Sequence, residues 1–333
     1  YLLNNRATIL EEQKLITLAI KNLKKVIKID PSYYPSQFNL ARIYFNLGEI
    51  KKSSILYKKC IKLKPDCLKL LYQYYRTTKN KIDISKINQI LKEVPSESNE
   101  IYSHFFKAKI AMKENDSTEE VINLKIAHNL YYKQNPGFKL FNSNWNQNIN
   151  KIKDLTSHLK PSSKSKRLYP IFIVGLPRSG STLIEKIISS SKVIPLEETQ
   201  ILFNTLTDFK NRNIKMSSID SLINRYNKFK NIDVYKNRFT DKSLENFEFV
   251  DLIKQTIPNA KIINCIRDPK SSIISILKNN LISVPWAHQI VDILKYFDRY
   301  YKIVSKPTFK DKNFIYNLKF ENLLNNPSLE TKK

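Results

Sequence analysis

A run of small and polar residues, Gly175-Leu-Pro-Arg-Ser-Gly-Ser-Thr182, is the part of this sequence best suited to bind an anion. An apolar segment, Ile171 to Val174, precedes the run and predicts a buried parallel strand. Strand, loop and helix start together direct several backbone N–H groups at one point, where the helix dipole adds positive potential. The segment therefore predicts a phosphate site, held by five consecutive residues: Arg178, Ser179, Gly180, Ser181 and Thr182.

The spacing of this loop is that of a nucleotide P-loop with one substitution. Ser181 occupies the position of the P-loop lysine, and the nearby cation is Arg178 instead. Because that lysine normally binds the β- and γ-phosphates of a triphosphate, we expect another phosphorylated ligand here. The helix that follows should bury a single apolar face, formed by Leu183, Ile184, Ile187 and Ile188.

A second segment has the same strand–turn–helix pattern. Its apolar stretch, Ile262 to Ile266, is followed by the turn Arg267-Asp-Pro and by a helical pattern that contains Ser275. An arginine at a strand end offers a planar, multidentate donor, and a serine two turns into the helix adds a neutral hydroxyl donor.

These two segments resemble the cofactor sites of sulfotransferases, which use 3′-phosphoadenosine 5′-phosphosulfate (PAPS). Pro177 to Thr182 resembles the family's 5′-phosphosulfate loop. Asn259 to Ser275 resembles its 3′-phosphate site, which implies that Arg267 and Ser275 hold the 3′-phosphate of the nucleotide. The resemblance implies PAPS as co-substrate; no metal is expected, since no ligand cluster is seen in the sequence.

Sulfuryl transfer needs a base for the acceptor's proton and cations for the leaving group. In many cytosolic sulfotransferases a histidine follows a lysine by two residues; Lys242 matches that lysine, but Leu244 occupies the histidine position. Leu196-Glu-Glu-Thr199 resembles a segment of tyrosylprotein sulfotransferases whose second glutamate is the base. The resemblance implies Glu198 as base and Lys242 as the cation at the bridging oxygen.

Each of these assignments has a plainer alternative. Glu197 and Glu198 could be a solvated helix start, where acidic residues favour the dipole. Lys242 could be one surface lysine among many. His288 could line the acceptor cleft, but a packed helix residue is the commoner outcome, and Cys265 should be a small core residue.

The N-terminal part repeats with a helical period. Pro31 and Pro65 each follow a helical pattern and lie 34 residues apart, the period of tetratricopeptide (TPR) repeats. Between them small and bulky residues occupy the expected positions, and Asn46-Leu-Gly48 is a helix-ending turn. Weaker helical patterns continue to Tyr132. Such repeats usually bind peptides, although these helices could only cover the catalytic domain.

Together these features predict an all-α TPR-like helical repeat domain followed by an α/β, P-loop-like sulfotransferase domain with a central parallel sheet. We place the repeats at 1–134, a connecting helix and polar linker at 135–167, and the sulfotransferase domain at 168–333. The whole resembles the bacterial TPR–sulfotransferase family. We expect the chain to be a fragment: it begins at Tyr1, and the family's late loop that closes on the 3′-phosphate should lie beyond Lys333.

Composition limits the partners. A net charge of +27 in 333 residues suits an anionic ligand, but the lysines are scattered along the chain, so we expect no nucleic acid partner. The chain has no apolar run long enough for a membrane span. Its three cysteines show no disulfide or metal spacing, which favours the cytoplasm.

The predicted activity is transfer of a sulfuryl group from PAPS to a hydroxyl-bearing acceptor, namely a peptide tyrosine, a sugar or a lipid. A protein or peptide could also bind the TPR helices. One alternative is a kinase or NTPase, which should have a P-loop lysine and a strand-end aspartate for magnesium. The other is a non-catalytic TPR scaffold with a degenerate transferase domain.

Overall fold

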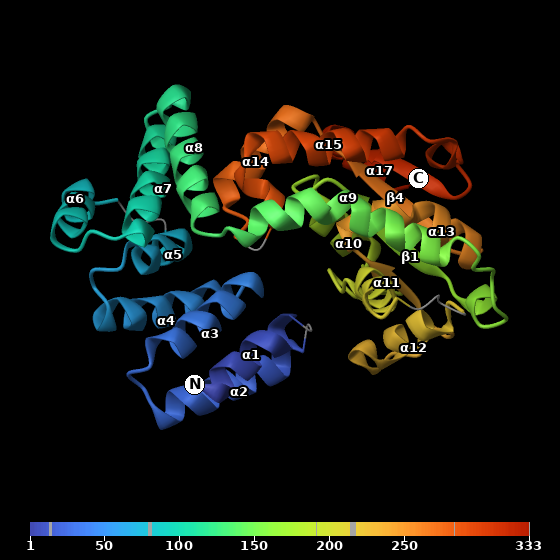
Figure 1. Ribbon diagram of the computed structural model, residues 1–333, viewed down its shortest axis with the longest axis horizontal. Coiled ribbons are helices and arrows are strands. Elements are labelled where there is room, and N and C mark those ends of the chain that lie inside the picture. Colours follow the sequence, from blue (N-terminus) through green and yellow to red (C-terminus); the bar gives the residue numbers. More distant parts are fainter. Residues whose placement is uncertain (13–14, 79–81, 191, 214–217, 283, 333) are drawn as a thin grey trace. The chain divides into compact units, whose positions relative to one another are not determined.

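The computed structural model describes residues 1–12, 15–78, 82–190, 192–213, 218–282 and 284–332 (Figure 1). The chain divides into two compact units, Tyr1–Gln134 and Asn135–Lys333, and each is described by itself. Within the described residues, no helix combines the length and the apolar character needed to cross a bilayer.

The first unit is built of helices alone within its described part. The helices are α1 (Leu2–Glu12), α2 (Ile16–Ile29), α3 (Tyr34–Asn46), α4 (Ile50–Leu63), α5 (Leu68–Thr78), α6 (Ile84–Glu93), α7 (Glu97–Lys113) and α8 (Ser117–Lys133). As the repeat period predicts, α2 and α4 each end two residues before a proline, at Ile29 and Leu63. The turn after α3 also forms as predicted, with Gly48 at a φ of 78°.

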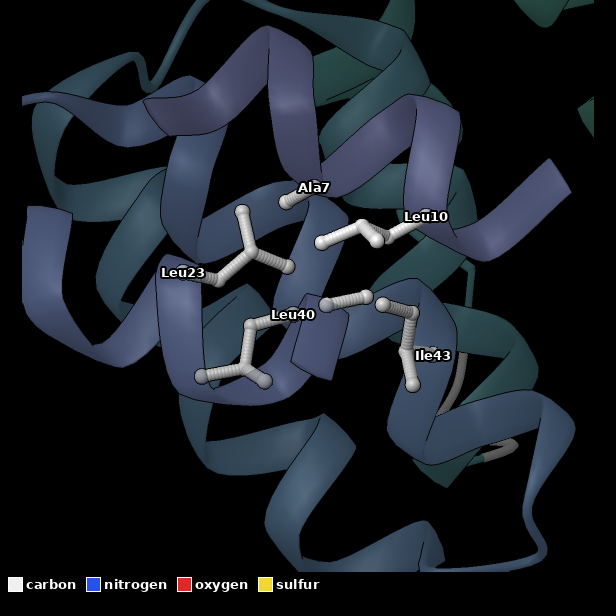
Figure 2. Packing of buried hydrophobic residues seen from close by; sticks show 6 residues of the cluster. Ala7, Leu10, Leu23, Leu40 and Ile43 are labelled. Atoms are coloured by element: carbon white, nitrogen blue, oxygen red, sulfur yellow. The ribbon is translucent and has the colours of Figure 1, made fainter. Parts of the chain in front are cut away.

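Small side chains allow these helices to pack closely. Ala41 and Ser53 are fully buried where α3 meets α4, and Ser53 donates a hydrogen bond to the Ala41 carbonyl at 2.8 Å. Aliphatic side chains fill the space between α1, α2 and α3. This core cluster consists of Ala7, Leu10, Ala19, Leu23, Leu40 and Ile43 (Figure 2).

The second unit contains a five-stranded parallel sheet in the order β2-β3-β1-β4-β5. The strands are β1 (Pro170–Gly175), β2 (Val193–Pro195), β3 (Arg238–Asp241), β4 (Lys261–Ile266) and β5 (Ile315–Lys319). The helices are α9 (Gly137–Thr156), α10 (Ser181–Ile188), α11 (Ile201–Asn211), α12 (Asp220–Lys228), α13 (Val250–Thr256), α14 (Pro269–Asn279), α15 (Ile290–Val304), α16 (Phe320–Asn325) and α17 (Pro327–Glu330). Short 3₁₀ segments include η1 (Ser165–Arg167), η3 (Leu244–Phe249) and η4 (Pro285–His288). The predicted α/β class is confirmed.

Helices cover both faces of this sheet. On one face, Ile173 of β1 and Cys265 of β4 pack against Ile184 of α10 and other apolar residues of the same cluster. On the other face, the Tyr300 hydroxyl of α15 donates a hydrogen bond to Asn264 of β4 at 2.8 Å. The predicted apolar face of α10 is correct for three residues but wrong for Leu183, which is 43% exposed.

Helix α9 begins at Gly137 and packs within the second unit. Its Lys153 forms an ion pair with Glu248 of η3 at 3.0 Å, and Arg299 of α15 binds the same carboxylate through two nitrogens. The Glu248 side chain is completely buried. Because a buried carboxylate is stable only with its cations in place, this cluster joins three segments into one body.

Replacement of Arg299 by methionine should destabilise the second unit strongly. Within the described part of the chain, Arg299→Met leaves the buried Glu248 carboxylate with Lys153 as its remaining ion-pair partner, and we expect a loss of about 3 kcal/mol in the free energy of unfolding. Urea unfolding can be followed by tryptophan fluorescence, since both tryptophans, Trp145 and Trp286, lie in the second unit.

Lys302→Met is the matched control on the same helix. Lys302 forms an i,i+4 ion pair with Asp298, and both side chains are more than half exposed, at 74% and 62%. The loss should therefore stay below about 0.5 kcal/mol. Equal effects of the two substitutions would show that the Glu248 cluster does not hold the second unit together.

Candidate active site

Three strands end side by side at one edge of the sheet. The ends are Gly175 of β1, Asp241 of β3 and Ile266 of β4, and all strands run parallel. The chain order reverses around β1, with β3 and β2 on one side and β4 and β5 on the other. In open parallel sheets, ligands bind outside the carboxyl ends at such a reversal.

The loop after β1 depends on its two glycines. Gly175 has a φ of 145°, and a Cβ atom there would lie 2.5 Å from the carbonyl oxygen of Cys265, so only glycine lets β1 and β4 come this close. Gly180 has a φ of 85° and precedes α10; a Cβ atom there would lie 2.3 Å from the ring of Phe320. Arg178, between them, also has a positive φ of 69°.

The hydroxyls of the loop differ in exposure. Ser179 is fully buried, and its Oγ has no hydrogen-bond partner among the described residues. Ser181 is also buried, whereas Thr182 is exposed on the first turn of α10. A buried hydroxyl without a protein partner loses the hydrogen bonds it made in water, and a bound phosphate oxygen would restore one.

The two predicted phosphate segments meet at this edge. Arg267 donates a hydrogen bond from Nη1 to the carbonyl oxygen of Arg178 at 2.6 Å. Arg178 in turn donates from Nε to the Ser275 hydroxyl at 3.1 Å. The structure thus brings Arg178 into contact with both Arg267 and Ser275, from a segment about ninety residues away in sequence.

Phe320, which sequence reasoning missed, supports both segments. Its ring lies next to Gly180, and the Arg267 guanidinium sits 5.2 Å from the ring centroid. The following residue, Glu321, accepts a hydrogen bond from the backbone N–H of Asp268 at 3.0 Å. Asp268 also caps α14, and the N–H of Ser271 lowers the pKa of its carboxyl.

The predicted catalytic residues form an ion pair. Lys242 Nζ lies 2.9 Å from Glu198 Oε1, and the side chains are 6% and 54% exposed respectively. The surface interpretation of Lys242 is therefore wrong. The helix-start interpretation of Glu197 and Glu198 is also wrong, because both lie in the loop between β2 and α11, which begins at Ile201.

An aspartate stands at a strand end beside β1, a feature expected of the kinase or NTPase alternative. Asp241 ends β3, and its carboxylate accepts hydrogen bonds from the hydroxyls of Thr199 at 3.1 Å and Tyr226 at 2.5 Å and from the N–H of Ser243 at 2.9 Å. Burial, followed by the charge of Asp241, raises the pKa of Tyr226. Both carboxylate oxygens already accept hydrogen bonds from protein groups, so binding magnesium would require these bonds to break.

His288 and Cys265 are both packed in the interior of the second unit. His288 is buried in η4, and its ring stacks on Phe138 with centroids 5.4 Å apart, which agrees with the packed interpretation. Cys265 lies inside β4, and burial raises the pKa of its thiol to about 12, as suits a small core residue.

Comparison with known proteins agrees with this geometry. Residues 170–333 match the sulfotransferase family, and residues 1–33 and 34–67 match the tetratricopeptide repeat. The chain thus contains a sulfotransferase-family domain preceded by TPR repeats.

Two individual proteins are also similar to parts of this chain. An uncharacterized protein of Aquifex aeolicus is 30% identical over 133 residues, which cover 33% of this chain and 17% of that protein. The chain therefore matches about one sixth of the length of that relative. A solved structure of a mutant O-GlcNAc transferase from Thermobaculum terrenum aligns with 78% of this chain and 44% of its own, at 13% identity and a TM-score of 0.27, too low to support a structural argument.

Substitution of Gly175 should damage the fold of the second unit. In Gly175→Ala the new Cβ meets a backbone carbonyl that cannot rotate away, in a region of φ that alanine avoids. We expect a loss of about 2–4 kcal/mol in the free energy of unfolding, measured by urea denaturation.

Gly137→Ala provides the same change of residue in open space. Nothing lies within 4 Å of a Cβ built on Gly137, which starts α9. That variant should be neutral or gain up to about 0.5 kcal/mol. A tolerated Gly175→Ala would show that β1 and β4 can separate at this point.

Proposed function

We propose that this protein transfers a sulfuryl group from PAPS to a hydroxyl acceptor. The observation that carries the proposal is the meeting of Arg178, Arg267 and Ser275 at the carboxyl edge of the sheet, through hydrogen bonds of 2.6 Å and 3.1 Å. A nucleotide with anionic groups on both its 3′ and 5′ positions needs two adjacent anion sites. This edge offers a backbone cradle on one side and a guanidinium–hydroxyl pair on the other.

The loop residues fit the 5′-phosphosulfate. The Ser179 hydroxyl is buried without a partner among the described residues, and the Gly180 position leaves no room for a side chain beside Phe320. Arg178, Ser179, Gly180, Ser181 and Thr182 would hold the phosphosulfate through backbone N–H groups, hydroxyls and one guanidinium. Arg267 and Ser275 would hold the 3′-phosphate.

Glu198 and Lys242 would carry the chemistry. Bound PAPS supplies the sulfuryl group and a phosphate leaving group. Glu198 accepts the proton of the acceptor hydroxyl, and Lys242 donates a hydrogen bond to the oxygen that bridges sulfur and phosphorus. The acceptor oxygen and this bridging oxygen lie on opposite sides of the sulfur atom, so the ion pair, now closed at 2.9 Å, opens when the reactants bind between its two groups.

Two features of the chain favour a peptide or protein as the acceptor. The Glu197-Glu198-Thr199 segment favours a peptide tyrosine over a sugar or a lipid hydroxyl. The TPR helices of the first unit favour a protein partner, because such repeats commonly bind peptides. The cytoplasmic location and the domain bounds 1–134, 135–167 and 168–333 stay predictions.

Binding of nucleotides should distinguish this function from that of a kinase. The chain should bind adenosine 3′,5′-bisphosphate much more tightly than ATP. Ser181 replaces the P-loop lysine, whereas Arg267 and Ser275 can donate hydrogen bonds to a 3′-phosphate. Titration calorimetry with both nucleotides, with and without magnesium, measures this. Equal or tighter magnesium-dependent binding of ATP would contradict the proposal.

Two variants test whether Arg267 and Ser275 hold the 3′-phosphate. Arg267→Ala removes a charge-assisted contact and should weaken binding of the bisphosphate by roughly 2–4 kcal/mol. Ser275→Ala removes one neutral donor and should cost about 1 kcal/mol. A larger effect of Ser275→Ala would show that Arg267 does not bind the 3′-phosphate.

Removal of the base should separate turnover from binding. Glu198→Gln should lower turnover of labelled PAPS by about 10²–10⁴-fold, the range for a lost general base, with little change in bisphosphate affinity or thermal stability. Glu197→Gln is the neighbouring control and should retain near wild-type turnover. Full activity of Glu198→Gln together with loss of activity in His288→Ala would assign the base to His288 instead.

A further inference from the structure

The loop that carries Glu198 has an unfavourable backbone conformation. Glu197 and Gln200 both have positive φ angles, 65° and 52°, although neither is glycine. Residues other than glycine adopt this region at an energetic cost, and they stay there only where surrounding contacts enforce it. The loop between β2 and α11 must therefore be held from outside.

Glu185 holds the first side of the loop. It lies on α10, one turn after Ser181 of the phosphate loop, and is only 4% exposed. A single carboxylate oxygen, Oε1, accepts hydrogen bonds from the Glu197 N–H at 3.0 Å and from the Thr240 hydroxyl of β3 at 2.6 Å. One buried side chain thus links the phosphate-loop helix to both segments that carry the catalytic pair.

Asp241 holds the other side. Its carboxylate accepts the hydrogen bond from the Thr199 hydroxyl, and the Thr199 oxygen in turn accepts from the N–H of Ile201 at 3.1 Å, where α11 starts. The residue that follows β3 completes the attachment, since the N–H of Lys242 donates to the carbonyl of Glu197 at 2.9 Å. The backbone on both sides of Glu198 is therefore fixed to α10 and β3.

We propose that Glu185 and Asp241 act as positioning residues: two buried carboxylates hold the loop on either side of Glu198 so that its carboxylate faces Lys242. This inference rests on the proposed function, in which Glu198 is the base. Glu185 also ties the base to the helix that begins at the phosphosulfate loop. The base and the sulfuryl donor therefore keep a fixed separation, as transfer in a single geometry requires.

The choice of Glu185 variants follows from its contacts. Both donors use the same oxygen, so the amide oxygen of glutamine can accept both bonds, whereas leucine of similar size accepts neither. Glu185→Gln is thus the conservative replacement and Glu185→Leu the disruptive one. Thr199→Val, which keeps the shape and removes the hydroxyl, breaks the attachment to Asp241 from the loop side and provides a second disruptive variant should Glu185→Leu fail to fold.

The experiment uses the full chain and three readouts. Hydrogen exchange reports the Glu197 amide, calorimetry reports affinity for adenosine 3′,5′-bisphosphate, and labelled PAPS reports turnover. In Glu185→Leu we expect exchange of that amide to accelerate at least about tenfold and kcat to fall about 10–100-fold, while KM for PAPS changes less than about threefold. Thr199→Val should lower kcat in the same way. Glu185→Gln should restore amide protection and most of the kcat.

The possible results separate this inference from the proposed function. Wild-type protein that neither binds the bisphosphate nor consumes PAPS would refute the function, and the exchange data alone would then judge the loop attachment. An unchanged Glu197 amide in Glu185→Leu would overturn the inference even in an active enzyme. So would a Glu185→Gln variant as impaired as Glu185→Leu, or a loss expressed in KM for PAPS rather than in kcat.

Discussion

The close approach of β1 and β4 at Gly175 is the constraint on which the rest of the site depends. Gly175 pairs with Cys265, and its missing side chain lets the Cys265 carbonyl oxygen lie only 2.5 Å from where a Cβ atom would be. Two residues beyond Cys265 the chain reaches Arg267, which binds the backbone of Arg178 in the neighbouring loop. A wider separation of these strands would move the two predicted phosphate segments apart, so one glycine sets the distance between them.

Buried carboxylates organise the parts of the second unit that the sheet alone does not place. Glu185 and Asp241 fix the loop of Glu198 through neutral donors, and Glu248 joins η3, α9 and α15 through Lys153 and Arg299. The chain has 30 acidic residues against 57 lysines and arginines, which gives it a net charge of +27. Glu185, Asp241 and Glu248 each accept two or more hydrogen bonds, because a buried charge is stable only when it is paired or hydrogen-bonded. The position of the Glu198 loop and the packing of η3, α9 and α15 therefore depend on the same kind of interaction.

Local signals made much of this arrangement predictable from the sequence. Glycine spacing, apolar runs and the 34-residue period each act over short stretches, and they gave the strands β1 and β4, the loop before α10, and the ends of α2 and α4. The family resemblance implied that the loop and Arg267 bind one nucleotide, and in the structure the two meet because β1 and β4 are parallel and end at one edge. The residue roles of Glu198, Lys242, Arg267 and Ser275 stay predictions, although their positions are consistent with them.

Contacts between residues far apart in the sequence could not be predicted from these local patterns. Nothing near Phe320 in sequence indicates that its ring lies beside Gly180 and under Arg267, 140 and 53 residues away. Leu183 has the right spacing for the buried face of α10, but the cluster there accommodates only Ile184 and the residues one turn on. Asp241 was overlooked because a short strand of four residues, Arg238–Asp241, carries little periodic signal.

Transfer of labelled sulfate tests the central claim most directly. The chain is incubated with PAPS labelled on sulfur and an extract of the cells from which it comes, and the products are separated and identified. The account predicts label on a hydroxyl of one or a few acceptors, with adenosine 3′,5′-bisphosphate as co-product and no requirement for magnesium. Release of label only as free sulfate at the rate seen without protein, or a matching transfer of phosphate from labelled ATP, would contradict it.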